Sequence, residues 1–290
     1  MKKFFSFVKI EHTLFSLPVI FSGMALAIHS FKGGSPEQLP DGRSLWVIGA
    51  WILLAATGAR TVGFAMNRII DRHIDARNPR TAIRDLPSGR MTLREGYAVM
   101  LVGAILYFLA AWQLNPLCLA LSPIPLAVFM IYPYMKRFTS LAHFGVGASL
   151  ALGPLGAFLA VRPDISAAMP AILLSLFTWC WVTGFDIIYS TADEQFDKKE
   201  GLHSLPSKLG SAGALKVSGV LHVIAFAILS ILYFTAFAGE WIPAMLLVVA
   251  GILLYFEQKL ATDVELAFFK INAVLGFVVF GFIMVGVGYT

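Results

Sequence analysis

Apolar segments long enough to cross a lipid bilayer follow one another along almost the whole chain, and this feature constrains the fold most. Of the 290 residues, 58% are hydrophobic and 13% are charged, whereas a soluble domain carries about 25% charged residues. A helix needs roughly 20 apolar residues to cross the bilayer, and its backbone must satisfy its own hydrogen bonds there. The sequence therefore predicts an all-α, polytopic membrane protein.

Polar breaks divide the apolar sequence into nine predicted membrane helices, which we assign to a single domain over residues 1–290. The third and fourth helices are separated only by Leu-Asn-Pro at 114–116, which predicts a tight turn. The 25 glycines favour close helix packing, because small residues let backbones approach one another in a bilayer. The predicted helices span 12–31, 46–68, 96–114, 116–134, 141–161, 167–190, 213–236, 241–260 and 267–288.

The basic residues predict how these helices are oriented. If the N-terminus is inside, the 22 basic residues all fall at inner positions, except Lys32, Arg43 and Arg162 outside and Arg60 within the second helix. Cytoplasmic loops are enriched in lysine and arginine, so we expect the N-terminus inside and the C-terminus outside. Topology thus accounts for the net charge of +5, and no nucleic-acid partner is expected.

The first 27 residues are similar to a signal peptide, with a basic front, an apolar middle and Ala-Leu-Ala at 25–27. Lys9, Glu11 and His12 interrupt the front, which favours a first helix retained as an anchor over a cleaved leader. Glu11 and His12 either line the inner mouth of the bundle or are ordinary interface residues.

Most of the aspartates lie in two inner segments that are far apart in the sequence. Asn67, Asp71 and Asp75 are spaced four residues apart, so they form one stripe if the second helix continues beyond the hydrocarbon. Like charges at this spacing repel one another on a helix, so a metal ion or the neighbouring arginines must compensate them. The second segment repeats the pattern on one helical face with Asp186, Tyr189, Asp193 and Asp197.

The chemistry of these stripes favours Mg²⁺ and a diphosphate. Mg²⁺ binds through carboxylates and phosphate oxygens, and the sequence has no histidine or cysteine cluster of the kind that zinc selects. The planar fork of arginine matches phosphate oxygens. A site of this kind at a membrane face predicts a substrate with a diphosphate head and a lipid tail. The basic residues beside the stripes are Arg72, Arg77, Arg80, Arg84, Lys198 and Lys199, whereas we interpret Asp85, Arg90, Arg94 and Glu95 as solvated.

The two segments resemble the paired motifs of the UbiA superfamily of intramembrane aromatic prenyltransferases. That family's first motif, Asn-Asp-x-x-Asp-x-x-x-Asp with an arginine-rich tail, is similar to "NRIIDRHID" and "RTAIRDLPSG" here. Its second, Asp-x-x-Tyr-x-x-x-Asp-x-x-x-Asp, begins at Asp186. Arg68 stands where the family commonly has an aspartate. The matching positions of the first motif and its tail are Asn67, Asp71, Asp75, Arg80, Thr81, Arg84 and Gly89.

The resemblance implies transfer of a polyprenyl group from its allylic diphosphate to a small aromatic acid, at a site facing the cytoplasm in the cell (inner) membrane. Mg²⁺ and membrane lipid are implied partners. The start "KIEHTLFSLP" and the Asn-Arg pair resemble a branch near the 4-hydroxybenzoate prenyltransferases of ubiquinone biosynthesis. That branch includes a menaquinone-pathway member acting on a dihydroxynaphthoate, and the sequence leaves the acceptor open. The implied metal ligands and catalytic residues are Asp71, Asp75, Asp193 and Asp197, with Tyr189.

Further residues are candidates for substrate contacts. Lys136 lies four residues after Tyr132, on one face at the inner end of the fourth helix. Tyr132 and Tyr189 either flank an allylic cation, since aromatic faces attract positive charge, or belong to an interfacial tyrosine belt. Arg60 is the one basic residue well inside a predicted span, and it contacts either the acceptor's carboxylate or a motif aspartate. The expected substrate residues are Asn67, Arg80, Arg84, Lys136, Tyr132, Arg60 and Asp186.

Two other classes of membrane protein place acids at helix ends. Phosphatidyltransferases concentrate their acids in one short stretch, whereas here the acids are divided between distant helices. A transporter would carry ionisable residues near the bilayer midplane and broken helices in matching halves. Because the acids cluster at one face, the enzyme is favoured. A transporter with a cytoplasmic-face acidic site stays the alternative, and the sequence does not predict the oligomeric state.

Overall fold

A computed structural model describes residues 7, 13–31, 42–264 and 266–289 of the chain. The N-terminal positions used to predict the orientation, Lys2, Lys3 and Lys9, lie outside the described residues, and so do Glu11 and His12. The N-inside orientation therefore stays a prediction.

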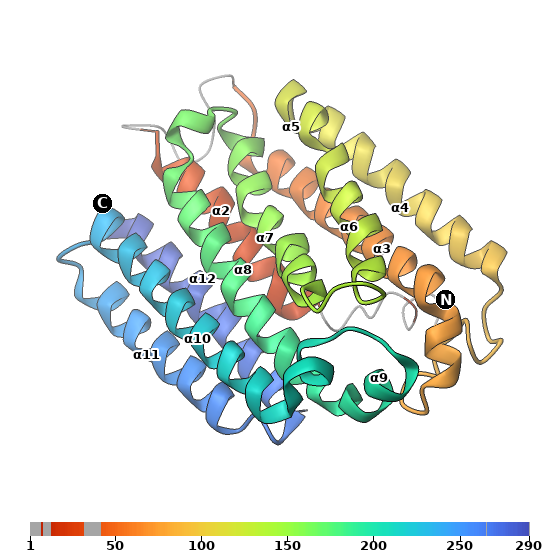
Figure 1. Cartoon of the computed structure of the whole chain (residues 1–290). Helices are drawn as coiled ribbons and strands as arrows, with labels where there is room; N and C mark the ends of the chain where they lie inside the picture. The colour runs from red at the N-terminus through yellow and green to blue at the C-terminus, as the bar shows by residue number, and fades with distance from the viewer. Residues whose placement is uncertain (1–6, 8–12, 32–41, 265, 290) are drawn as a thin grey trace.

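The described part of the chain is helical throughout and contains no strand, which confirms the predicted all-α class (Figure 1). Seven of its helices are long and apolar enough to cross a membrane, with 116–135 taken as one segment. The first and ninth predicted segments correspond to shorter apolar helices, so nine spans stays a prediction. The helices are α2 (Thr13–His29), α3 (Leu45–Arg77), α4 (Leu93–Leu114), α5 (Pro116–Leu121), α6 (Pro123–Met135), α7 (Ala142–Val161), α8 (Met169–Ser190), α9 (Glu194–Glu200), α10 (Leu205–Ala236), α11 (Trp241–Lys259) and α12 (Asn272–Tyr289).

Helix α8 lies at the centre of the bundle and packs against α7 and α10, with α2 also in contact (Figure 1). Its fully buried Trp181 stacks on Phe177 with ring centroids 5.6 Å apart and meets Phe185 edge-on at 5.7 Å. The Trp181 indole N–H donates to Asn272 Oδ1 of α12 at 2.6 Å, which satisfies a polar group that burial would otherwise penalise. The second acidic segment therefore begins on the most firmly packed helix.

Helix α3 is held against α4 by close backbone contact. A Cβ added at Gly58 would lie 2.8 Å from the Gly103 carbonyl oxygen, and one added at Gly103 would lie 2.8 Å from a Thr61 side-chain carbon. Only glycine allows this approach, as expected for helix packing in a bilayer. The contact fixes the helix that carries the first acidic stripe.

The tight turn predicted at 114–116 is present, but the helix after it is divided. Asn115 is extended (φ −172°), accepts a hydrogen bond from Cys118 N at 2.8 Å and donates to Leu159 O at 2.9 Å. The predicted helix 116–134 breaks at Ser122 into α5 and α6, because the prolines at 123 and 125 supply no backbone N–H to continue the ladder.

Two other expectations about helix boundaries are corrected. The second acidic segment is not one uninterrupted helix, since α8 ends at Ser190 and a 3₁₀ turn (Thr191–Asp193) precedes α9. Helix α10 begins at Leu205, eight residues before the predicted start, where a Ser204–Ser207 capping box opens it. Gly210, at φ 71°, then bends its first turns. The predicted continuation of the second helix past the hydrocarbon is correct, because α3 runs to Arg77.

Candidate active site

The first acidic stripe lies buried on the inner face of α3, at one end of the bundle. Asp71 is 2% exposed and Asp75 4% exposed. Lys136, at the end of α6, places its Nζ 2.6 Å from Asp71 Oδ2, and Asn67 Nδ2 donates to the same oxygen at 3.3 Å. Asn67, Asp71 and Lys136 therefore form one contact group, as the sequence analysis expected of substrate and metal residues in one site.

The loop after α3 folds back over the stripe and supplies the partner of Asp75. Asn78 ends the helix, and its Oδ1 accepts a hydrogen bond from Arg80 N at 2.9 Å, which turns the chain. Thr81 Oγ1 donates to the Asp75 carbonyl at 3.1 Å. Arg84 Nη1 then reaches Asp75 Oδ1 at 2.7 Å, so the first motif carries its own arginine.

Arg80 joins the first motif to the second. Its Nε donates to Asp193 Oδ1 at 2.9 Å, its Nη2 contacts Asp193 Oδ2, and its Nη1 donates to Tyr189 Oη at 2.5 Å. The guanidinium lies 4.6 Å from the centroid of the Tyr189 ring. Asn78 Nδ2 also donates to Asp193 Oδ1 at 2.8 Å. The two motifs, separated by more than a hundred residues in sequence, therefore meet at a single place.

This bridge shifts the titration of Arg80. Burial alone lowers the pKa of its guanidinium, but the hydrogen bonds to Asp193 and Tyr189 outweigh burial and raise the pKa above its ordinary value. Arg80 is therefore a permanent cation between the two motifs.

Lys136 also approaches the second motif. Its carbonyl accepts a hydrogen bond from His203 N at 2.7 Å, which ties the end of α6 to the segment after α9. Lys136 and His143 both interact electrostatically with Asp197. Asp197 thus lies within electrostatic range of the same basic group as Asp71.

Asp186 has a partner that the sequence did not suggest. His143 of α7 places Nδ1 2.8 Å from Asp186 Oδ2, and its Nε2 faces Leu205 N at 3.4 Å. A ring whose Nε2 accepts from a backbone N–H carries its proton on Nδ1, so the imidazole donates to Asp186. A single histidine near a helix start gives no spacing pattern, which is why sequence analysis missed it.

Three other side chains lie nearby. Tyr132 interacts electrostatically with Asp71 and Asp186, so it belongs to the site region. Arg60 lies deeper in α3, with its guanidinium 4.7 Å from the Phe64 ring centroid, and its predicted contact to an acceptor stays a prediction. Arg68 is 7% exposed and lies within electrostatic range of Asp75 and Tyr189. Its Nη1 is buried without a hydrogen-bond partner among the described residues.

The same carboxylates have spare capacity for a divalent cation. Across the described ranges, no three histidine, cysteine, aspartate or glutamate side chains already converge as a metal site. Asp71 Oδ1 and Asp75 Oδ2 are nevertheless buried and have no hydrogen bond within the described part of the chain, and Arg137 Nη2 is 4.0 Å from the former. Hard oxygen donors of this kind fit Mg²⁺ completed by phosphate oxygens. The arginines and Lys136 compensate the stripes, and oxygens remain for a metal.

Comparisons with known proteins agree with this architecture. Two 4-hydroxybenzoate octaprenyltransferases, from Citrobacter koseri and Serratia proteamaculans, are each 32% identical to the chain. The alignments cover 77% and 81% of this chain and 73% and 79% of theirs. The solved structure of a UbiA homolog from Aeropyrum pernix K1 matches 97% of this chain and 98% of its own, with a TM-score of 0.80 and 32% identity. A UbiA homolog from Archaeoglobus fulgidus bound to GPP and Mg²⁺ shares the fold at 18% identity, with a TM-score of 0.65.

Fold and site together define the class of membrane prenyltransferases. The model of the UbiA prenyltransferase family matches residues 16–274, and the chain belongs to this family. The predicted family and enzyme class are therefore confirmed.

Proposed function

We propose that this prenyltransferase moves a polyprenyl group from an allylic polyprenyl diphosphate to 4-hydroxybenzoate, with Mg²⁺ as cofactor and ubiquinone biosynthesis as the setting. The names of the two bacterial relatives support the acceptor. Complexes of the archaeal homologues with GPP or DMAPP and Mg²⁺ support the donor class and the metal. Prenylation of a dihydroxynaphthoate for menaquinone biosynthesis is the second candidate, because few of the residues assigned to the acceptor would distinguish one aromatic ring from the other.

The observation that carries the proposal is the contact of Arg80 with both Asp193 and Tyr189. It joins the loop after the first motif to the second motif, and a diphosphate bound between the motifs would meet acids and bases together. Asp71, Asp75, Asp193 and Asp197 would hold Mg²⁺, which supplies positive charge to the leaving diphosphate and promotes its departure.

The basic residues exchange partners when the donor binds. Lys136, Arg84 and Arg80 now contact Asp71, Asp75 and Asp193 respectively. A diphosphate offers them oxygens of higher charge, and the released carboxylate oxygens become free for the metal. Arg68, buried beside them with an unbonded Nη1, would add a further donor to the diphosphate. Fixed positive groups aimed at the developing charge stabilise the transition state.

The prenyl carbon then meets the aromatic ring. The carbon–oxygen bond of the donor breaks with its electron pair on the diphosphate, a ring carbon forms the new carbon–carbon bond, and the ring loses a proton. Tyr189 and Tyr132 would face the allylic cation with their rings. Asp186, oriented by His143, would accept a hydrogen bond from the phenolic hydroxyl and enrich the ring in electrons. Arg60, deeper in α3, would contact the acceptor's carboxylate.

The proposal is tested with the purified full chain in detergent and geranyl diphosphate as the donor. We expect diphosphate release that requires both Mg²⁺ and 4-hydroxybenzoate, together with a prenylated product detected by mass spectrometry. Product only with 1,4-dihydroxy-2-naphthoate would transfer the assignment to the second acceptor. If diphosphate were released when both acceptors are left out of the reaction, aromatic prenylation would be refuted and a transport or hydrolytic role favoured.

A further inference from the structure

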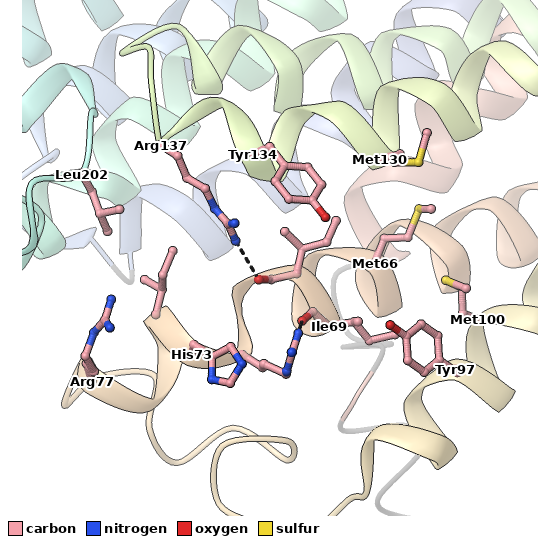
Figure 2. Close-up of a pocket in the computed structure, with 13 residues that line it drawn as sticks. Met66, Ile69, His73, Arg77, Tyr97, Met100, Met130, Tyr134, Arg137 and Leu202 are labelled. Carbon is pink, nitrogen blue, oxygen red and sulfur yellow. Dashed lines mark hydrogen bonds between the residues drawn. The ribbon is translucent and has the colours of Figure 1, made fainter.

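A groove lies on the face of α3 that points away from the acidic stripe. Helices α4 and α6 are joined through the turn at Asn115, and both pack against α3 (Figure 1). At the end of the bundle where the motifs lie, residues of α4 and α6 line a groove of about 620 Å³ whose floor is α3 (Figure 2). This volume is within the range of small-ligand sites.

The groove is apolar along its length and basic at its end. Its apolar part consists of Met66, Met100 and Met130 with neighbouring isoleucines, and Tyr97 and Tyr134 stand on its two walls (Figure 2). Methionine side chains adapt to irregular apolar partners, and tyrosines are enriched where hydrocarbon meets headgroups. None of the described residues that line the groove is acidic, and its basic lining residues are Arg72, His73, Arg77 and Arg137.

The position of the groove in the bundle determines what it can meet. Met130 is 50% exposed and Tyr97 48% exposed on the outer surface of helices assigned to the membrane. The basic groups lie in the last turns of α3 and just after α6, at the expected headgroup level. The groove therefore runs from the hydrocarbon to the interface, and its occupant has an apolar tail and an anionic head.

Local hydrogen bonds hold the guanidiniums in place without consuming their donors. Arg72 Nη1 donates to Ile69 O at 2.9 Å, and Arg137 Nη2 donates to Ile70 O at 2.9 Å (Figure 2). Arg137 also lies 4.8 Å from the Tyr134 ring centroid. Each bond uses one of five N–H donors of an arginine, so the remaining donors can reach phosphate oxygens.

We propose that this groove binds one anionic phospholipid, with its phosphate on Arg72, His73 and Arg137 and an acyl chain along Met66, Met100 and Met130. The prenyl diphosphate is a poorer match, because a diphosphate with Mg²⁺ needs carboxylates and the groove offers none. Asp71 and Asp75 are buried and do not line the groove, and among the basic groups of the groove Arg137 Nη2 approaches them, at 4.0 Å from Asp71 Oδ1. The inference stands apart from the acceptor and donor proposed above.

Native mass spectrometry of the full chain tests the proposal, with phosphatidylglycerol compared against phosphatidylcholine. We expect phosphatidylglycerol adducts to be favoured in the unaltered protein, and their affinity to fall at least about fivefold in R72Q/H73Q, since one basic residue near an anionic membrane surface contributes roughly that factor. R72K keeps the positive charge at position 72 and should retain the adduct. R94Q is the matched control, because Arg94 is an exposed arginine at the same end of α4 that does not line the groove.

Four results would overturn the assignment. Equal binding of the two lipids would mean that the groove does not select an anionic headgroup. Equal loss of phosphatidylglycerol binding in R72Q/H73Q and R94Q would mean the same. Displacement of phosphatidylglycerol by geranyl diphosphate at equal concentration would assign the groove to the prenyl donor. Loss of a protein dimer in lipid-free R72Q/H73Q would assign it to a second copy of the chain.

Discussion

In the first acidic motif, Asp71 and Asp75 lie on one long helix and are almost fully buried, and each has its own cation at 2.6–2.7 Å. In the second motif, Asp193 is the last residue of a 3₁₀ turn and obtains its cation from the loop of the first motif. Among the described residues, the side-chain partner of Asp186 is His143. The negative charge of the first motif is therefore balanced by Arg84 of its own loop and by Lys136 at the end of α6. The second motif depends on Arg80 of the first for its charge balance. This difference predicts that damage to the first motif affects both halves of the site.

The largest effect is expected from Asp71→Asn. The substitution removes the charge that faces Lys136 and leaves one fewer oxygen for Mg²⁺, so we expect prenyl transfer to fall about 10²–10³-fold, as for other preorganised electrostatic groups. Product formation at saturating Mg²⁺ measures this. Asp164→Asn, an aspartate in the loop before α8 at the opposite end of the bundle, should leave the rate unchanged, and equal losses in both variants would contradict the account.

A somewhat smaller loss is expected from Arg80→Gln, which removes the bridge itself. Catalytic efficiency toward geranyl diphosphate should fall about 100-fold, because a bidentate charged contact to the second motif is lost. Arg80→Lys should recover only part of it, since lysine keeps the charge without the planar fork. Full recovery by lysine would show that only the charge at position 80 matters.

Arg68→Gln tests the residue that departs from the family's usual aspartate. We expect the KM for geranyl diphosphate to rise about 10-fold with little change in the Mg²⁺ requirement, because a hydrogen bond to a charged group contributes about 1.5–3 kcal/mol. Titration of the initial rate with geranyl diphosphate and with Mg²⁺ measures the two separately. A gain of activity in Arg68→Asp would instead mean that the arginine occupies a metal-ligand position.

His143→Gln should act on the acceptor and spare the donor. Loss of the imidazole leaves Asp186 without its positioning partner, so the KM for 4-hydroxybenzoate should rise several-fold, about 3- to 10-fold for one neutral hydrogen bond. The KM for geranyl diphosphate should not change. A change confined to the donor would remove Asp186 from the acceptor side of the site.

The smallest effect is expected from Arg77→Gln. Arg77 Nε lies 2.7 Å from Glu200 Oε2 and thereby ties the two motif segments at the surface, but its side chain is 56% exposed. Exposed ion pairs contribute about 0–1 kcal/mol, so thermal unfolding in detergent should shift by no more than that amount. A larger destabilisation would show that this surface contact, and not the Arg80 bridge, holds the motifs together.

Periodicity in the sequence predicted most of the helices and the first stripe, because hydrocarbon leaves the backbone few alternatives to a helix; the second stripe is interrupted by the 3₁₀ turn at Thr191–Asp193. The extension of α3 to Arg77 followed from the four-residue spacing of Asn67, Asp71 and Asp75. The helix boundary at Ser122 depends on the prolines that follow it, and the boundary at Leu205 depends on a capping box. A hydropathy profile detects neither feature.

Contacts between segments that are distant in the chain could not be predicted from the sequence. The roles of Asn78 and His143 depend on which helices pack side by side, and neither residue belongs to a repeated pattern. The groove on α3 likewise depends on how α4 and α6 pack against that helix, although two of its basic residues, Arg72 and Arg77, had been noted beside the first stripe. Charge spacing identifies a face of a helix, whereas the partner of that face is decided by tertiary packing.

A double-mutant cycle on Arg80 and Asp193 tests most directly whether the two motifs form one site. The free energy of unfolding would be measured for the unaltered protein, R80A, D193A and the double variant, with R80A combined with D164A as the distant control. Direct contact predicts a coupling free energy of about 1–2 kcal/mol for Arg80 with Asp193 and additivity with Asp164. Additive effects for Arg80 and Asp193, within about 0.3 kcal/mol, would contradict a shared site.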